Sequence, residues 1–257
     1  MTSEQPVPIP AATLVVFRRA PDEGPAQLLM VIRSKALAFA GGMAVFPGGR
    51  VDEEDHALAA RLVPDGDHDE IAHRIAAIRE TLEETGLAVG FRRGCDAATA
   101  ARTRETLLSS GSLEEAMARN GLELDPASLT PFARWLPLGL AHGRIFDTRF
   151  YLADLGTGNV EITVDETENT RLFWITAEDA LAKADRGELS LIFPTRRNLE
   201  RLAQFADFAS ARSHAEATPQ RIITPQIVRT EEGQALTIPD DLGYPVTREK
   251  LSSAMRS

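Results

Sequence analysis

Short runs of apolar and β-branched residues open the chain and predict strands. TLVVFRR (13–19) and LLMVIRS (28–34) flank the turn-type segment APDEGPAQ, which predicts a hairpin. A third strand begins at Met43 and breaks at Pro47-Gly48-Gly49, where glycine allows unusual dihedrals and close approach of a ligand. Three more runs predict strands at 132–139, 146–155 and 171–176.

Helical periodicity is strongest from Asp69 to Thr85, with Asp69 as the expected N-cap and Gly86 as a left-handed C-cap. Further helices are predicted at 56–63, from Ala177 onward, and as one long helix at 195–214. Residues 97–128 predict one or two helices divided at Asn120-Gly121, and the tail predicts a small hairpin. Strands, a helix, more strands and then helices indicate an α/β fold with helices packed on a mixed sheet.

The helix at 69–85 gathers three glutamates on one face. Glu80, Glu83 and Glu84 stand at i, i+3 and i+4, opposite an apolar stripe made by Ile71, Ile75, Ile78 and Leu82. Each like-charge pair at this spacing costs roughly 0.2–0.5 kcal/mol, and acidic groups in the last turn oppose the helix dipole. A bound divalent cation would offset these costs, because carboxylates suit Mg²⁺ or Mn²⁺. The alternative is a solvated acidic face.

Composition narrows the class of protein. The net charge of −10 argues against a nucleic-acid partner, although a bound cation could reverse the local field for a small anionic substrate. Cys95 is the single cysteine, so a reducing compartment is expected. The polar, proline-rich start does not have the order of a signal peptide, and no apolar stretch predicts a membrane span. We expect a cytoplasmic protein without a membrane partner.

The arrangement Gly48-Gly49 … Arg79-Glu80-x-x-Glu83-Glu84-x-Gly86-Leu87 resembles the signature of the Nudix hydrolases. Two departures stand out. Asp55 occupies the place of the signature's first glutamate, and positions 56–78 separate it from Arg79 where the family has seven residues. Lengthening a loop this way costs only about 1 kcal/mol. It leaves open whether Asp55 reaches Arg79.

An interrupted signature of this kind is similar to one branch of the family, the acyl-coenzyme A diphosphatases and their bacterial relatives. The resemblance covers roughly residues 11–245 and implies a Nudix-type α/β/α sandwich with a central mixed β-sheet. The coenzyme A signature's His-x-Gly-Gln is replaced by Ala40-Gly41-Gly42-Met43. The expected organisation is a flexible N-terminus (1–10), a Nudix domain (11–215) with insertions at about 56–70 and 97–128, and a C-terminal hairpin and tail (216–257).

The resemblance also implies site residues. It gives Glu80, Glu83 and Glu84 as ligands of Mg²⁺ or Mn²⁺, and makes Glu83, Glu84 and Arg79 part of the catalytic machinery. Glu168, in the acidic segment VDETENT, is the preferred general base, with a solvated loop as the alternative. The expected substrate-binding residues are Arg33, Gly48, Gly49 and Arg50. For Arg79 a plain ion pair with Glu83, and for Arg33 a surface salt bridge, are the alternatives.

The implied activity is metal-dependent hydrolysis of a nucleoside diphosphate linked to another moiety, with coenzyme A or acyl-coenzyme A as leading substrate. Three alternatives are an ADP-ribose or NADH pyrophosphatase, a nucleotide-sensing Nudix module that does not cleave, and a hydrolase of a non-nucleotide phosphate. The expected partner is thus a small nucleotide-type molecule. A homodimer is a candidate assembly, because homodimers are frequent among such relatives.

Overall fold

A mixed eight-stranded sheet forms the centre of the molecule. The computed structural model describes residues 7–20, 23–35, 40–138, 144–155, 169–231 and 233–254. The strands are β1 (Ile9–Arg18), β2 (Gln27–Arg33), β3 (Ala44–Val45), β4 (Gly48–Arg50), β5 (Thr130–Trp135), β6 (Phe146–Asp154), β7 (Asn169–Ile175) and β8 (Ile222–Ile223). Their order is β3-β2-β1-β6-β5-β8, with β4 paired to β1 and β7 paired to β2. Only β1–β6 and β5–β8 among these pairs are parallel.

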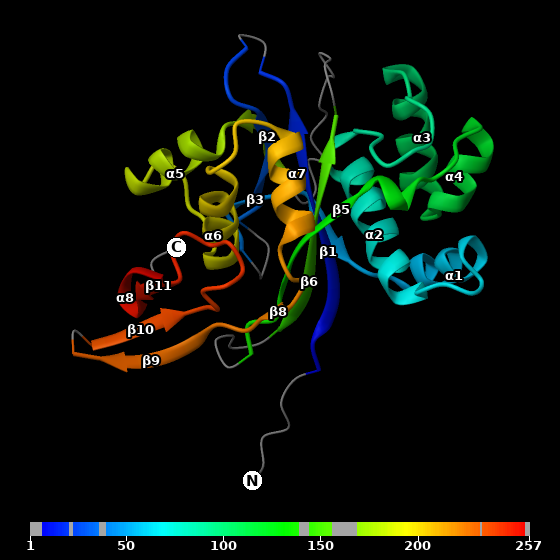
Figure 1. Ribbon diagram of the computed structural model, residues 1–257. Helices are drawn as coiled ribbons and strands as arrows, with labels where there is room; N and C mark the ends of the chain where they lie inside the picture. Colours follow the sequence, from blue (N-terminus) through cyan, green and yellow to red (C-terminus); the bar gives the residue numbers. More distant parts are fainter. Residues whose placement is uncertain are drawn as a thin grey trace.

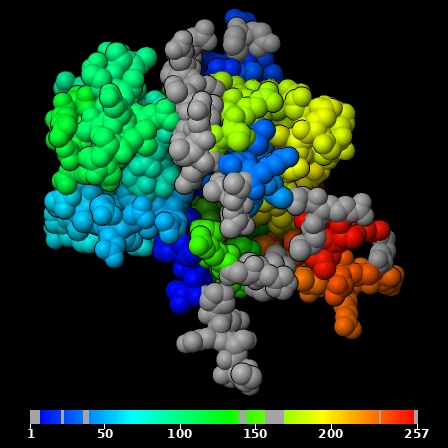
Figure 2. Space-filling model, turned by 180° about the vertical axis from the view of Figure 1, so that it is seen from behind, coloured from blue at the N-terminus to red at the C-terminus, as the bar shows by residue number. Residues whose placement is uncertain are grey.

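Helices cover both faces of this sheet (Figure 1). One layer contains α1 (Glu53–Leu62), α2 (His68–Thr85), α3 (Ala97–Ser110) and α4 (Leu113–Asn120); the other contains α5 (Ala177–Asp185), α6 (Phe193–Leu202) and α7 (Phe208–Ala217). Seen from behind, the two layers form separate lobes, cyan to green and yellow-green to yellow (Figure 2). The predicted α/β/α sandwich with a mixed sheet is therefore confirmed.

Alternation along β1 explains why there are two cores. Leu14 and Val16 pack with α2, whereas Val15 and Phe17 pack with α5, α6 and α7 on the other face. Side chains of successive strand residues point to opposite faces, so a strand covered by helices on both sides is apolar throughout. The continuous run TLVVF follows from this double burial.

The sheet splits beside α2. Strands β1 and β2 pair directly at Phe17↔Leu28 and at the adjoining Arg18↔Gln27, and then diverge. The segment 44–50 fills the gap, because β3 pairs with β2 while β4 pairs with β1. The chain reverses between β3 and β4, which places the Gly48-Gly49 pair in the opening of the sheet.

Some predicted helix boundaries are wrong. The expected long helix at 195–214 is two helices, because Asp207 accepts a hydrogen bond from the Ser210 N–H (2.8 Å) and starts α7 anew. The segment 97–128 divides at Gly111, whose φ of 70° ends α3, and not at Asn120-Gly121, which ends α4. Local capping overrode the overall apolar pattern at both places.

The C-terminal part extends the predicted hairpin by one strand. Strands β9 (Gln226–Thr230), β10 (Gly233–Thr237) and β11 (Arg248–Lys250) form a second sheet, followed by α8 (Leu251–Ala254). Between β10 and β11, Tyr244 is buried and packs edge-to-face on Trp135. None of the helices in the described ranges is both long and apolar enough to cross a bilayer.

Candidate active site

Helix α2 carries the three glutamates and is fixed at both ends. Its N-cap is Asp67, whose side chain accepts from the Glu70 N–H (3.0 Å), so the expected N-cap Asp69 lies inside the first turn. Gly86 has a φ of 75° and donates its N–H to the Leu82 carbonyl, as predicted. The buried face of α2 packs on β1. The helix end is thereby held against the opening between β1 and β2.

The diglycine turn meets the glutamates directly. The Gly48 N–H donates to Oε2 of Glu84 (3.1 Å). A Cβ placed on Gly49 would lie 2.3 Å from both Cδ and Oε1 of Glu80, and one on Gly48 would lie 2.3 Å from the Ala12 carbonyl oxygen. A side chain at Gly48 would collide with backbone, and one at Gly49 would force the Glu80 carboxylate to move. The two parts of the motif, 31 residues apart from Gly49 to Glu80, are thus in contact.

Burial makes these carboxylates unusual. Glu84 is 4% exposed, and the side chains of Glu80 and Glu83 are 16% and 24% exposed. Burial, opposed by Arg79 and reinforced by Glu83 and Glu84, raises the pKa of Glu80 to about 8. Burial also raises the pKa of Glu83, again against the effect of Arg79. The solvated acidic face does not describe this arrangement, because the acids turn toward the protein.

Arg79 ties the carboxylates to the insertion. Its Nε and Nη2 donate to the two oxygens of Asp55 (3.1 and 2.9 Å), and its Nη1 donates to Glu80 (2.9 Å) and Glu83 (3.3 Å). Nη2 also donates to the Arg50 carbonyl (2.9 Å). Although burial acts to lower it, the pKa of Arg79 is raised by Asp55, Glu80 and Glu83. Arg79 therefore does more than form a simple pair with Glu83.

The insertion keeps Asp55 in reach of Arg79. Asp55 is 2% exposed and lies in the first turn of α1, where it accepts from the Asp52 N–H (2.9 Å) in a capping box. Leu58 and Ala59 then pack α1 onto the α2 side of the sheet. The additional residues between Asp55 and Arg79 thus form α1 and its connection to α2 without displacing the acid.

Other predicted residues occupy different positions. Arg33 ends β2 and pairs across the strands with Asn169, whereas the exposed Arg50 contributes its backbone carbonyl to Arg79. Glu168 lies outside the described residues.

Sequence reasoning missed Arg104, which donates from α3 to the Glu83 carbonyl (2.9 Å). No local signal marks Arg104, because α3 reaches the end of α2 only through tertiary packing.

The donor chemistry fits a hard divalent cation. Carboxylate and backbone carbonyl oxygens are the ligands that Mg²⁺ and Mn²⁺ prefer. Within the described ranges, no three His, Cys, Asp or Glu side chains already form a metal-binding group. Glu80 and Glu83 are instead hydrogen-bonded to Arg79, and Glu84 to the Gly48 N–H. An ion would have to compete with Arg79 for Glu80.

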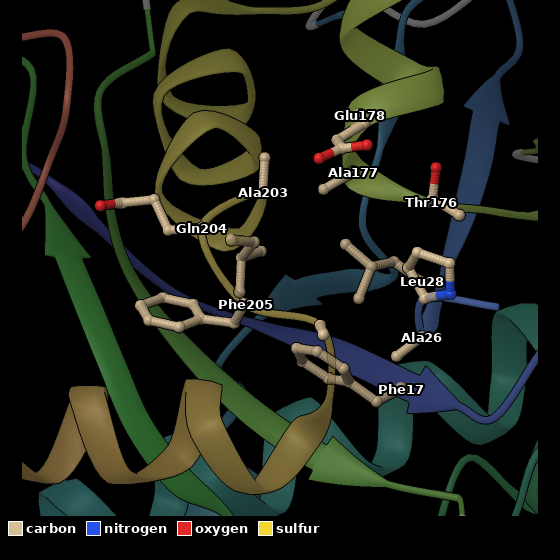
Figure 3. Close-up of a pocket in the computed structure, with 12 residues that line it drawn as sticks. Phe17, Ala26, Leu28, Thr176, Ala177, Glu178, Ala203, Gln204 and Phe205 are labelled. Atoms are coloured by element: carbon tan, nitrogen blue, oxygen red, sulfur yellow. The ribbon is translucent and has the colours of Figure 1, made fainter.

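A separate hollow of about 250 Å³ lies between β1, β2, α5 and the connection from α6 to α7 (Figure 3). Phe17 and Leu28 line it, and both belong to the core on the side of α5, α6 and α7. The glutamates of α2 lie on the opposite face of the sheet. The hollow is therefore not part of the candidate active site.

Two known proteins resemble this chain in sequence or in fold. No family model matches the chain. The chicken (Gallus gallus) protein named acyl-coenzyme A diphosphatase NUDT19 is 30% identical to this chain, in an alignment that covers 74% of this chain and 65% of that protein. The crystal structure of a NUDIX hydrolase from Alicyclobacillus acidocaldarius superposes with a TM-score of 0.66 at 29% identity, over 80% of this chain and 96% of that one.

An α/β/α sandwich with a glutamate-bearing helix end against a diglycine turn is the arrangement that the resemblance to the Nudix hydrolases implied. With the two similarities, the chain is similar in sequence and in fold to the Nudix hydrolases. It spans just under two thirds of the length of the chicken relative.

Proposed function

We propose that the chain is a divalent-metal-dependent diphosphatase that hydrolyses a nucleoside diphosphate linked to another moiety. The observation that carries the proposal is the convergence of Glu80 and Glu84 on the Gly48-Gly49 turn. Coenzyme A or acyl-coenzyme A is the leading substrate, supported by the name of the chicken relative. An ADP-ribose or NADH pyrophosphatase is the alternative within the same chemistry.

Glu80 and Glu84 would hold the cation, with Glu83 as a third ligand or through water, and the cation is Mg²⁺ or Mn²⁺. When bound, it neutralises charge on the diphosphate and activates the attacking water. Gly49 permits the approach of the Glu80 carboxylate, and Gly48 orients Glu84 through its N–H. The substrate phosphates would lie along this turn, within reach of Arg33 and Arg50. Glu168 is our candidate for the general base.

Arg79 would position Glu80 and Glu83 and not contact substrate. Asp55 occupies both Nε and Nη2 of its guanidinium, which leaves Nη1 directed at the two glutamates. A bidentate contact of this kind fixes the plane of the guanidinium. The carboxylates therefore have a defined geometry before an ion arrives.

The test is turnover of a substrate panel by the purified protein with Mg²⁺ or Mn²⁺. Coenzyme A, an acyl-coenzyme A, ADP-ribose, NADH and a non-nucleotide phosphate would be followed by mass spectrometry. We expect cleavage of a diphosphate by the wild type and a loss of about 100-fold or more in Glu84→Gln, because a charged ligand is removed while an acceptor for the Gly48 N–H remains.

Glu105→Gln, on the exposed side of α3, is the matched control and should keep full activity. Tight binding of a panel member without turnover would instead identify a nucleotide sensor. Equal rates in Glu84→Gln and the wild type would contradict the metal-dependent mechanism.

A further inference from the structure

Asn169, the first residue of β7, is buried without using its carboxamide. It has no exposed surface, and neither Nδ2 nor Oδ1 has a hydrogen-bond partner in the part of the chain that the structure describes. Buried side-chain amides nearly always have partners, because an unsatisfied donor or acceptor keeps the full cost of losing water. A group with two unused polar atoms therefore needs an explanation beyond packing.

A β-bulge determines the direction of this side chain. Ile32 pairs with Arg171, but Arg33 pairs with Asn169, so Thr170 is an extra residue in β7. Directly paired residues share a face of the sheet, and a one-residue shift reverses the face. Without the bulge, Asn169 would point with Phe173 toward the core formed with α5, α6 and α7. With it, Asn169 points to the same face as Arg33.

That face is the one on which α2 lies. Along β2, Leu29 packs with α2 on this side, and Arg33 follows it at an even spacing. The Nε of Arg33 is also buried and lacks a partner among the described residues. Arg33 and Asn169 are therefore adjacent and on the α2 side, and the Nε of Arg33 and both polar atoms of the Asn169 carboxamide are unsatisfied within the described ranges.

The pair lies a few strands away from the diglycine turn. Beside Arg33, Ile32 pairs with Ala44 of β3. The chain then turns from β3 into β4, where Gly49 pairs with Ala12 of β1. Three strand spacings of about 4.8 Å separate β7 from β4, so Asn169 is roughly 15 Å from the turn across the sheet. This separation suits the part of an extended substrate that lies beyond its diphosphate.

We propose that Arg33 and Asn169 form a binding subsite for the non-reacting half of the substrate. The proposal rests on the diphosphatase function proposed above. Arg33 would face a phosphate oxygen, and Asn169 would bind a neutral group that both donates and accepts hydrogen bonds. A phosphate alone does not fit Asn169, because its oxygens only accept and would leave Oδ1 unsatisfied. A nucleobase edge and an amide of an acyl-carrier arm both have the required chemistry.

The test is Asn169→Leu, which keeps a similar volume and removes both polar atoms. With coenzyme A and Mg²⁺ we expect KM to rise about tenfold while kcat stays within about twofold, since contacts distant from the reacting atoms contribute uniform binding. The melting temperature should stay constant or rise, because an unsatisfied amide has been replaced by an apolar group. A purely structural role for Asn169 would not move KM.

Binding of the separate substrate halves tests the subsite without turnover. Calorimetry with adenosine 5′-monophosphate and with 4′-phosphopantetheine should show about tenfold weaker binding of one of them to Asn169→Leu, which identifies the half that Asn169 contacts. Asn169→Asp keeps the shape, loses the donor and places a carboxylate beside Arg33, so it should weaken the same ligand further. Glu105→Gln, on the exposed side of α3 and away from β7, is the control and should match the wild type.

The two proposals fail differently. If the wild type cleaves a diphosphate but KM and half-substrate affinities are the same in Asn169→Leu, the subsite is wrong and the diphosphatase stands. If both halves bind to the wild type and Asn169→Leu binds one of them more weakly, but no diphosphate is cleaved, the subsite is right and the proposed activity is wrong. The protein would then bind its ligand without cleaving it. Failure of the wild type to bind either half overturns the subsite.

Discussion

At the scale of single residues, glycine and aspartate explain how the candidate site can exist. Gly49 allows Glu80 to approach the turn more closely than any side chain would permit, and Gly48 offers its N–H to Glu84. Asp55 accepts hydrogen bonds from Nε and Nη2 of the buried Arg79. The signature was enough to predict that positions 48, 49, 80 and 84 belong to one candidate site. The use of Asp55 in place of glutamate required the structure, because its reach depends on where α1 begins.

Gly49→Ala should damage the site more than the fold. The added methyl would lie 2.3 Å from the Glu80 carboxyl carbon and displace that carboxylate. A shift of about 1 Å at a catalytic group can cost around 100-fold in rate, and we expect a loss of kcat of this order. Turnover of the best substrate in the panel is the measurement. Gly94→Ala, where an added Cβ meets nothing within 4 Å, is the control.

At the scale of elements, the insertion supports the candidate site through Asp55 and α1. Helices α1 and α2 meet through the buried pair of Asp55 and Arg79 and through Leu58 and Ala59. Periodicity predicted α2 and its C-cap well, because a long apolar stripe and a glycine cap are local signals. It failed at 203–207, where a capping aspartate starts a new helix within an amphipathic pattern. Capping competes with periodicity, and sequence alone does not weigh the two.

Asp55→Ala should destabilise the protein strongly. It would leave the buried Arg79, 6% exposed, without its bidentate partner. Breaking a buried pair typically costs about 3–5 kcal/mol, and because Arg79 keeps its contacts with Glu80 and Glu83 we expect a loss of about 3 kcal/mol. Chemical denaturation would measure the free energy of unfolding. Asp65→Ala, exposed and in the same insertion, is the matched control and should change it by less than about 0.5 kcal/mol. Equal stability of the two variants would show that the pair is not a structural support.

At the scale of the whole molecule, each helical layer contains a histidine whose pKa is lowered by the fold. His73 on α2 is 3% exposed, and burial lowers its pKa. His214 on α7 accepts a hydrogen bond from the Arg201 Nε (3.2 Å), and burial together with Arg201 lowers its pKa. In both cases the unfolded chain binds a proton more readily than the native one. Stability from these groups is present at neutral pH and is lost as pH falls through about 6.5.

We therefore expect the double variant His73→Gln, His214→Gln to lose less stability than the wild type between pH 7.5 and 5.5. Glu80, whose pKa is raised, acts in the opposite direction, because its contribution to stability is lost as the pH rises. Glu80 is present in both proteins, so the difference between the variant and the wild type reports on the histidines. Melting temperatures across this range are the measurement. His56→Gln, on the exposed side of α1, should follow the wild type. A parallel decline in all three proteins would rule out this role for the two histidines.

The amino-acid sequence was enough to predict the fold class, the longer strands of the main sheet, the helix α2 with its cap, and the glutamate cluster, because each has a local pattern of hydrophobicity or motif spacing. The short strands β4 and β8 were not predicted. Tertiary structure alone decided which acid holds Arg79, that Arg104 reaches the end of α2, and that a bulge turns Asn169 toward Arg33. These contacts join residues that are distant in sequence or depend on a one-residue shift between strands. Side-chain direction reverses with such a shift, and no periodicity in a single strand records the register of its neighbour.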